Sequence, residues 1–513
     1  MKPIDSTGTR EPAAVRAGVS HARCRPEGVL EGGILRAPTY GARLDSVDLR
    51  AARSIPGVTV VHDGAFVGVA APGRAEAKLA LEQIAARWSP VAAPDEAGIE
   101  AYLRSHPQDG DSWDAEAESE GDLAAAWADS AVRAEGTYCT AYIAHVPLEP
   151  RVAVARWDGD RLTVWLGTQT PFRAREQVAR AIGIPVEDVR IIVPPTGAGF
   201  GGKHGGEVAV EAARLARAAR RPVRVRYSRE EEFRFGYFRP MSIVDVRAGA
   251  DSGGHLTAWE FENVNGGSAA VAPPYRTRAR RVRSAPARSP LPQGSYRSLA
   301  AVANNFAREV TVDELAVALG RDPVEFRAEN LNDVRLERVL RTAAGRAGGK
   351  IGPLSGGRGR GIALGLEKDG RIATVADVRV DTDRRVRVDR LVSVFEAGRI
   401  VDRDRLGRQV EGAAVQGLGG ALFEAVRFDP GTVRNARLSE YRVPRFSDLP
   451  EVVVELLDAP EHPPAGGGET PVIAVAPAIA NAIWAAVRIR LHALPLVPSG
   501  YLPPPAEPSG GPG

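Results

Sequence analysis

The chain has 513 residues, of which 44% are hydrophobic and 26% charged, values that are ordinary for a globular protein. Its 67 lysines and arginines nearly balance its 64 aspartates and glutamates, so the net charge of +3 indicates neither nucleic-acid nor anionic-membrane binding. The two cysteines, Cys24 and Cys139, cannot hold a four-cysteine zinc site or iron–sulfur cluster. A chain of this length predicts roughly two to four domains, each with its own core.

The N-terminal residues, MKPIDSTGTREPAAVRAG, lack the apolar core of a signal peptide, and we see no apolar run of about 18 residues. The sequence therefore predicts a cytoplasmic protein without a membrane-spanning helix. Cys24 and Cys139 are expected to be reduced thiols, and a single disulfide between them is the alternative.

Short β-type runs that alternate with helical patterns predict an α+β protein. A polar lead-in (1–28) precedes an α+β domain (29–90), in which we expect a short helix at 45–54 and an amphipathic helix at 74–88. Residues 91–130 are acidic and poor in large apolar side chains, which predicts an exposed linker.

Residues 131–342 are expected to form one large region. It begins with strands and a helix at 171–185, and continues with a hairpin that turns at Asp251–Gly254. The arginine-rich, proline-rich segment 276–298 is expected to be a solvated loop. A helix pattern follows and breaks at Gly320–Pro323.

A Gly-rich segment (343–360) is expected to be a flexible joint before a last region at 361–498. In that region we expect strands, a glycine-punctuated helix at 408–426 and a final helix at 476–494. Residues 499–513 are expected to be a disordered tail.

Two loops stand out chemically. The first, GAGFGGK (Gly197–Lys203), follows a Val- and Ile-rich strand and precedes an Ala-rich helix, so its backbone N–H groups could face an anion. It matches neither GxxxxGK[ST] nor GxGxxG with a later acidic residue. The second, GGGETP (Gly466–Pro471), holds one carboxylate among Gly, Thr and Pro. We expect the two loops to meet over a bound cofactor, with Glu469 as the base. The alternatives are a purely structural turn and an ordinary loop carboxylate.

Several blocks, in the same order, resemble the molybdopterin-binding large subunit of the xanthine dehydrogenase/aldehyde oxidase family. The blocks are GTQTPF (167–172), TGAGFGGK (196–203), SREEEF (228–233), 296–316, 322–331, 409–424 and 468–496. Residues 35–61 resemble the family's small hammerhead domain. The form of the 296–316 block is most similar to the isoquinoline 1-oxidoreductase and nicotinate dehydrogenase branch.

The resemblance implies a hammerhead-like domain at 29–90 and two molybdopterin-binding regions, at 131–342 and 361–498. In such enzymes molybdopterin, alone or as its cytosine dinucleotide, carries molybdenum. The metal centre oxidises a carbon of an N-heterocycle or an aldehyde with oxygen from water. Electrons then leave through [2Fe–2S] clusters, which here would belong to an iron–sulfur partner subunit.

The family's motifs place the base on Glu469 and put cofactor-binding residues at Gln169, Gly199, Phe200, Gly201 and Arg297, with Gln409 and Gln416 as further candidates for pterin contacts. No side chain of the chain is expected to ligate the metal. A carboxylate enclosed by Gly, Thr and Pro with few donors would have a raised pKa, which suits a base near neutral pH.

Four features depart from the family's pattern. His204 occupies a position where purine-oxidising members have a glutamate, and Leu299 one where they have a phenylalanine. Glu396 occupies a position where the family usually has an aspartate. In addition, nothing in residues 1–30 resembles the E-x-GQG and serine-rich segments with which this branch normally begins. We therefore expect a fragment, a split subunit or a degenerate copy. The alternative function is a non-catalytic homologue that needs a partner chain to complete the cofactor site.

His145 could be a ligand, but a satisfied buried histidine is the preferred interpretation.

Overall fold

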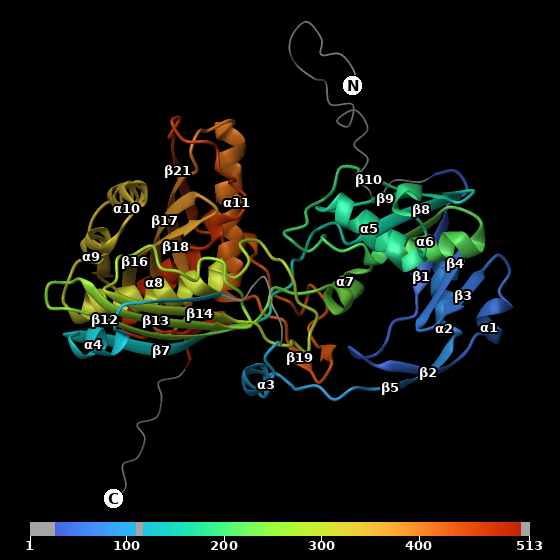
Figure 1. Ribbon diagram of the computed structural model, residues 1–513, viewed down its shortest axis with the longest axis horizontal. Helices are drawn as coiled ribbons and strands as arrows, with labels where there is room; N and C mark the ends of the chain where they lie inside the picture. Colours follow the sequence, from blue (N-terminus) through green and yellow to red (C-terminus); the bar gives the residue numbers. More distant parts are fainter. Residues whose placement is uncertain (1–25, 109–115, 504–513) are drawn as a thin grey trace, which may run out of the picture.

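The computed structural model describes residues 26–108 and 116–503, which form two lobes (Figure 1). One lobe is built around a seven-stranded sheet, and the other around a six-stranded and a five-stranded sheet. Helices pack on all three sheets, so the α+β class predicted from the sequence is confirmed. The lead-in at 1–25 and the tail at 504–513 lie outside the described residues.

The seven-stranded sheet combines two stretches of chain that the sequence assigned to different domains. In spatial order its strands are β10 (Val189–Ile192), β9 (Arg161–Leu166), β8 (Val152–Asp158), β11 (Val223–Arg226), β1 (Leu30–Ile34), β4 (Phe66–Ala71) and β3 (Thr59–Asp63). Leu30 of β1 lies opposite Val223 of β11 in a parallel pairing. The segment 29–90 is therefore not a closed domain, because its strands continue a sheet that begins in residues 152–226.

Helices α2 (Arg74–Glu82), α5 (Pro171–Ile182) and α6 (Glu207–Ala219) pack on this sheet. The α6 helix buries an alanine-rich face against β8 and β11, as the Ala-rich pattern predicts.

Two predictions for 29–90 were wrong at the level of single elements. The amphipathic helix ends at Glu82 rather than Trp88, because Ala85–Ser89 form strand β5. Its partner is β2 (Arg43–Asp48), which occupies the start of the predicted helix at 45–54 and leaves only α1 (Arg50–Arg53). Strand pairing, a tertiary contact, outweighs the local helical preference here.

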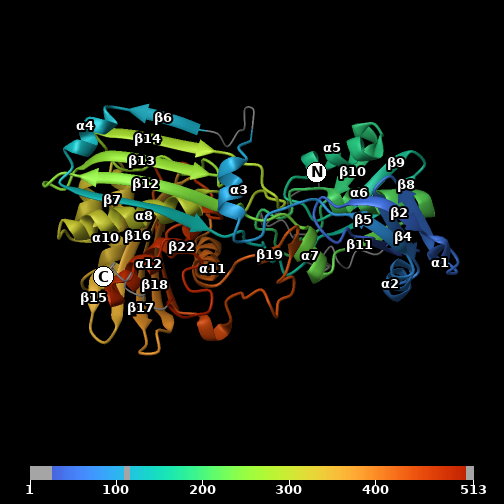
Figure 2. The ribbon, with the colours of Figure 1, turned by 90° about the horizontal axis from the view of Figure 1, so that it is seen from below.

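The six-stranded sheet forms the outer layer of the second lobe (Figure 2). In spatial order its strands are β22 (Ala493–Leu494), β7 (Val132–Thr140), β12 (Ser242–Ala250), β13 (Leu256–Val264), β14 (Ala279–Ala285) and β6 (Glu116–Glu120). The predicted hairpin is confirmed, since β12 and β13 pair antiparallel across Asp251–Gly254.

Strands β14 and β6 correct two expectations at one edge of this sheet. The basic segment 276–298 was expected to be a solvated loop and the acidic segment 91–130 a linker, yet the two pair with each other. The side chain of Arg280 contacts Glu118, and Arg283 lies 3.1 Å from Glu262 of β13. Each segment is highly charged because its partner, distant in sequence, carries the opposite charge. Segment 91–130 also contains α3 (Ile99–Ser105) and α4 (Leu123–Ala128).

The five-stranded sheet lies under the six-stranded sheet, and helices pack on its faces. Its strands are β15 (Gly352–Leu354), β16 (Arg358–Glu367), β17 (Gly370–Val380), β18 (Val386–Glu396) and β21 (Glu451–Leu457). The helices of this lobe are α8 (Ala301–Ala318), α9 (Pro323–Asn330), α10 (Val334–Ala347), α11 (Arg403–Leu422) and α12 (Val475–Val487). The predicted break at Gly320–Pro323 separates α8 from α9, and α11 is the predicted glycine-punctuated helix.

The predicted flexible joint at 343–360 is largely regular structure. Helix α10 continues to Ala347, β15 follows, and β16 begins at Arg358. Glycine composition overstated the flexibility of this segment. Its Gly359 is needed for close packing, because a Cβ there would lie 2.3 Å from the carbonyl oxygen of Ala482 in α12.

Helix α12 is the most apolar element of the chain. The window Thr470–Val487 has a mean hydropathy of 1.7, so the expectation of no long apolar run was wrong. However, 83% of that window is buried between α8, α11 and the five-stranded sheet, which identifies it as a core helix. The helix ends at Val487, where Arg488 adopts a left-handed conformation, and not at residue 494.

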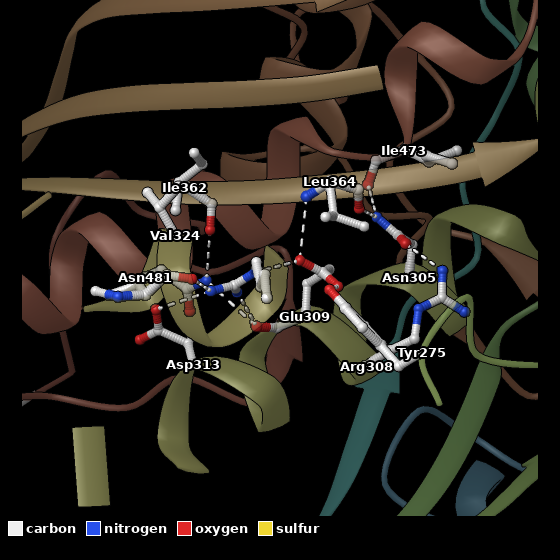
Figure 3. Close-up of polar contacts among 12 residues, drawn as sticks. Tyr275, Asn305, Arg308, Glu309, Asp313, Val324, Ile362, Leu364, Ile473 and Asn481 are labelled. Carbon is white, nitrogen blue, oxygen red and sulfur yellow. Dashed lines mark hydrogen bonds and ion pairs between the residues drawn. The ribbon is translucent and has the colours of Figure 1, made fainter. Parts of the chain in front are cut away.

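A buried polar network joins α8 to the five-stranded sheet (Figure 3). The Glu309 carboxylate accepts hydrogen bonds from Tyr275 Oη at 2.6 Å, Arg327 Nε at 2.8 Å and the N–H of Leu364 at 3.1 Å. Asp313, one turn further along α8, accepts from Arg490. The two predicted regions, 131–342 and 361–498, are thus joined by a shared buried interior.

Short elements lie between the lobes (Figure 1): α7 (Arg229–Phe235), β19 (Phe428–Asp429) and β20 (Thr432–Val433). Ser228 and Glu231 form a capping box that starts α7. At the C-terminal end, Leu502 is buried and its N–H donates to Arg384 at 3.0 Å, so the described part of the expected tail is packed.

Candidate active site

The glycine-rich turn lies between β10 and α6, as predicted. Gln169, from the loop after β9, accepts the N–H of Gly201 at 3.0 Å through its side-chain oxygen. Phe200 has a φ of 55° and Gly201 a φ of 96°. A Cβ on Gly201 would lie 2.7 Å from the carbonyl oxygen of Ser295, so only glycine fits there. The turn is therefore a tightly fixed backbone that leaves the Phe200 ring partly exposed.

Lys203, the cation at the end of this turn, points into the protein. Its side chain is only 1% exposed, and its Nζ lies 3.6 Å from the carboxylate of Glu149, which also accepts the N–H of Gly197 at 2.7 Å. Burial lowers the pKa of the Lys203 ammonium. Lys203 thus supports the turn from the protein interior. Its ammonium does not point to the exposed side of the turn, where a ligand could bind.

Arg297 connects the turn to two further segments. Its N–H donates to the carbonyl of Phe200 at 2.9 Å, and its guanidinium donates to the side chain of Gln416 at 3.0 Å and to the carbonyl of Gln409 at 3.2 Å. The same guanidinium contacts the carbonyl of Gly468 in the GGGETP loop. Burial lowers the pKa of Arg297 despite the nearby Glu469 charge. One residue thus ties together three parts of the chain, through its backbone N–H and its guanidinium.

Glu469 is held by its backbone and by its side chain. Ser298, the residue after Arg297, donates its hydroxyl to the Glu469 carbonyl at 2.6 Å. The Glu469 carboxylate lies 2.5 Å from Lys368 Nζ at the turn between β16 and β17. The side chains of Lys368 and Glu469 are 48% and 39% exposed, respectively. We expected the Glu469 carboxylate to be enclosed and to have few hydrogen-bond donors, and this expectation was wrong. The carboxylate is partly exposed to solvent and pairs with the Lys368 ammonium.

A cavity of about 730 Å³ opens beside these loops. Its lining includes His204 and Leu299, two of the positions at which the sequence departs from the family's pattern. The rest is mainly polar, with Arg173, Glu176 and Gln293 among the contributors. Burial, and after it the charge of Arg173, lowers the pKa of His204, while the Glu469 charge raises it. Glu469 does not itself line the cavity, but its charge acts on His204, which does.

The structure brings all the predicted site residues into one connected cluster, which we call the Arg297 cluster. Its members are Gln169, Gly199, Phe200, Gly201, Arg297, Gln409, Gln416 and Glu469. Sequence reasoning missed Lys368, Ser298 and Tyr296, whose hydroxyl accepts from Gln416 at 2.8 Å. The EKDG turn that carries Lys368 matches no chemical motif, so no signal pointed to it.

Two other residues singled out from the sequence lie in ordinary structural roles. His145 is buried, its Nε2 lies 2.7 Å from the carbonyl oxygen of Ser295, and burial lowers its pKa to about 3. The interpretation of a satisfied buried histidine is confirmed. Glu396 is buried and accepts two hydrogen bonds from Arg335, at 2.8 and 2.6 Å.

The donor set of the Arg297 cluster suits a polar, anionic organic group. Among the residues that the structure describes, no acceptor takes the N–H of Gly199 or Phe200, and no group of three or more His, Cys, Asp and Glu side chains could hold a bare ion. Amides from Gln169 and Gln416 and the Arg297 guanidinium add further hydrogen-bonding groups. The cluster therefore fits a cofactor that supplies its own metal ligands, as molybdopterin does.

Comparison with known families gives two matches to the molybdopterin cofactor-binding domain, at residues 106–331 and 371–450. Together they cover more than half of the chain. The chain belongs to the molybdopterin-binding large subunits of the xanthine dehydrogenase/aldehyde oxidase family.

Individual relatives agree with this assignment. A nicotinate dehydrogenase subunit from Pseudomonas putida is 29% identical, over 91% of this chain and 44% of its own length. The aldehyde oxidoreductase molybdenum-binding subunit PaoC from Escherichia coli is 31% identical, over 68% of this chain and 53% of its own length. The chain thus spans about half the length of these curated relatives.

The crystal structure of quinoline 2-oxidoreductase from Pseudomonas putida 86 superposes with a TM-score of 0.81. The match covers 94% of this chain and 95% of that chain at 17% identity, and it supports the fold.

Proposed function

We propose that this chain is the molybdopterin-binding part of a molybdenum hydroxylase that oxidises an N-heterocycle or an aldehyde with water as the oxygen source. The observation that carries the proposal is the Arg297 cluster. Arg297 joins the Phe200 turn to the loop that presents Glu469, so the cofactor-facing backbone and an acid lie side by side. Relatives named for nicotinate and for aldehydes support the choice of substrate classes.

The residues divide into holding groups and one acid–base group. Gln169, the backbone of Gly199 to Gly201, Gln409 and Gln416 would hold molybdopterin through hydrogen bonds. When bound, that group supplies the molybdenum centre at which a two-electron oxidation with water-derived oxygen takes place. Arg297 orients the Gly468 carbonyl and places a positive charge beside the site, where it stabilises developing negative charge.

Glu469 is proposed as the general base. Its Oε2 would receive the proton of the attacking water-derived oxygen, a role for which a partly exposed carboxylate is suited. Lys368 occupies that oxygen here, at 2.5 Å, so the ammonium must move aside before the carboxylate can accept a proton. The pair is partly exposed, and such pairs contribute only about 0–1 kcal/mol, so separating it costs little.

Electrons would leave through iron–sulfur clusters that these 513 residues do not hold. Cys24 and Cys139, the only cysteines of the chain, cannot bind an iron–sulfur cluster between them. We therefore propose an iron–sulfur subunit as partner, consistent with the relatives named as subunits. A cytoplasmic location is part of the same proposal.

The test is metal analysis of the chain purified alone and after co-expression with the products of adjacent genes. We expect stoichiometric molybdenum and pterin in at least the co-expressed preparation, together with hydroxylation of an N-heterocycle or an aldehyde. Absence of molybdenum from both preparations would contradict the proposal and favour a non-catalytic homologue.

A further inference from the structure

The turn between β16 and β17 places one lysine directly over the proposed base. Lys368 and Asp369 adopt left-handed conformations, with φ of 48° and 59°, and make the tight reversal that links the strands. The turn is attached to the Glu469 loop, because Thr470 donates its hydroxyl to the carbonyl of Glu367 at 2.7 Å. Arg371 donates to the carbonyl of Asp369 at 2.9 Å from the other side. The backbone that carries Lys368 is therefore fixed relative to the site.

The Lys368 ammonium is available for exchange. Within the described part of the chain its one hydrogen bond goes to Glu469, and its side chain is 48% exposed. By contrast, Lys203 is buried and Arg297 has several backbone and amide acceptors. Lys368 is thus the cation of the site that can turn to a new anion without breaking the fold.

Two cations lie beside the Glu469 carboxylate. Lys368 and Arg297 both interact with its carboxylate, and His204 lies close enough for both the Glu469 and the Lys368 charges to affect its pKa. The cavity lining beside His204 carries charges of both signs, from Arg173 and Arg180 and from Glu176 and Glu207. Glu367 is partly buried, and burial raises its pKa. A second anion that approaches Glu469 would therefore find the Lys368 ammonium as an exposed cation within reach.

We propose that Lys368 is the specificity-determining residue for a substrate that carries a carboxylate on its aromatic ring, and that the substrate's carboxylate takes Lys368 Nζ from Glu469. This inference rests on the proposed function and narrows its substrate class. The exchange has a chemical consequence, since it removes the cation from the base in the same event that binds the substrate. A neutral heterocycle has no such group, so with that substrate the ammonium would have to leave Glu469 without gaining a new anionic partner.

The test compares two ligands that differ in one group: pyridine-3-carboxylate and pyridine-3-carboxamide. Binding to the full chain, in its cofactor-loaded form and without an electron acceptor, is measured by calorimetry for wild type, Lys368→Met and Lys368→Arg. Lys78→Met is the matched control, because Lys78 is an exposed lysine of α2 in the other lobe.

We expect Lys368→Met to weaken carboxylate binding at least about tenfold while leaving carboxamide binding within about twofold, the pattern for loss of one charge partner. Lys368→Arg should retain most of the carboxylate affinity, and Lys78→Met should change neither ligand. Equal weakening of both ligands by Lys368→Met, or no binding of the carboxylate by wild type, would overturn the inference.

The hydroxylase function and the specificity role of Lys368 can be disproved independently of each other. Because binding is read without turnover, a Lys368-dependent preference for the carboxylate in a preparation that oxidises neither compound contradicts the hydroxylase function alone. Conversely, turnover that depends on Glu469 while kcat/KM for the carboxylate is unchanged in Lys368→Met overturns the specificity role alone.

Discussion

Two polar clusters of the second lobe use the same residue types in opposite ways. Glu309 and Arg327 are 0% exposed, and their charges are met by each other, by Tyr275 and by backbone groups. In the Arg297 cluster, the Glu469 side chain is 39% exposed and pairs with Lys368. The first arrangement stabilises a fold, because a buried charge needs complete pairing. The second leaves a carboxylate whose partner can be exchanged.

The two clusters lie close together along the chain. Helix α8 begins shortly after Leu299 and carries Glu309 in its buried middle. The buried network thus holds the helix whose preceding residues, Arg297 and Ser298, position Glu469. Such rigid support is what a preorganised site requires.

The largest effect on stability is expected from Arg327→Met. Removing the guanidinium leaves the Glu309 carboxylate buried without its ionic partner, which costs about 3–5 kcal/mol. Urea unfolding monitored by circular dichroism measures it. Lys368→Met is the matched comparison and should lose no more than about 1 kcal/mol, because its pair is partly exposed. Equal losses for the two variants would remove the distinction between the clusters.

A pH effect of similar size is expected from Glu424. This side chain is buried, and burial raises its pKa to about 8, against hydrogen bonding from Tyr441 and the charge of Arg239. Because its folded pKa is raised, its contribution to stability is complete below its unfolded pKa and is lost as pH rises toward about 8. Between pH 5 and 8 the free energy of unfolding should fall by up to roughly 4 kcal/mol from this group.

Glu424→Gln tests this assignment, because glutamine fills the space but does not titrate. Chemical unfolding of both proteins at several pH values should give a steeper decline for wild type. If the free energy of unfolding depends on pH in the same way for both proteins, the pKa of Glu424 is the same in the folded and the unfolded chain.

A smaller effect is expected from Gly201→Ala in the glycine-rich turn. The added Cβ would meet the backbone carbonyl of Ser295 at 2.7 Å in a residue with φ of 96°, so a loss of about 1–3 kcal/mol is expected. Gly466→Ala is the control in the other loop, since a Cβ there meets nothing within 4 Å. A thermal melt that shows equal shifts for both variants would contradict the tight fit of the Phe200 turn.

Much of this fold and site follows from local sequence pattern. Helices α6, α8 and α11 and the β12–β13 hairpin have strong periodicity or turn signals, and the residues from Gln169 to Glu469 lie in recognisable blocks. The incorrect predictions share one cause, because each concerns a segment whose structure depends on a partner distant in sequence. From sequence alone, β6 and β14 are each predicted to be solvated segments, and 29–90 is predicted to be a domain. The structure shows instead that β6 pairs with β14 and that β1 pairs with β11.

The same cause limits prediction of the site itself. The sequence places Glu469 beside glycines, and only the fold places Lys368 over it, from about a hundred residues earlier in the chain. Lys203, at the end of the glycine-rich turn, likewise received no partner from the sequence, and the fold places it in the interior beside Glu149.

Turnover of the cofactor-loaded Glu469→Gln enzyme tests the central claim most directly. Glutamine keeps the size of the side chain and removes the basic oxygen, so molybdenum content should stay at the wild-type level. The rate should nevertheless fall by at least about 100-fold. Glu461→Gln, in the same exposed stretch before the glycine loop, should leave the rate unchanged. A Glu469→Gln enzyme with full molybdenum and wild-type turnover would remove Glu469 from the chemistry and contradict the account.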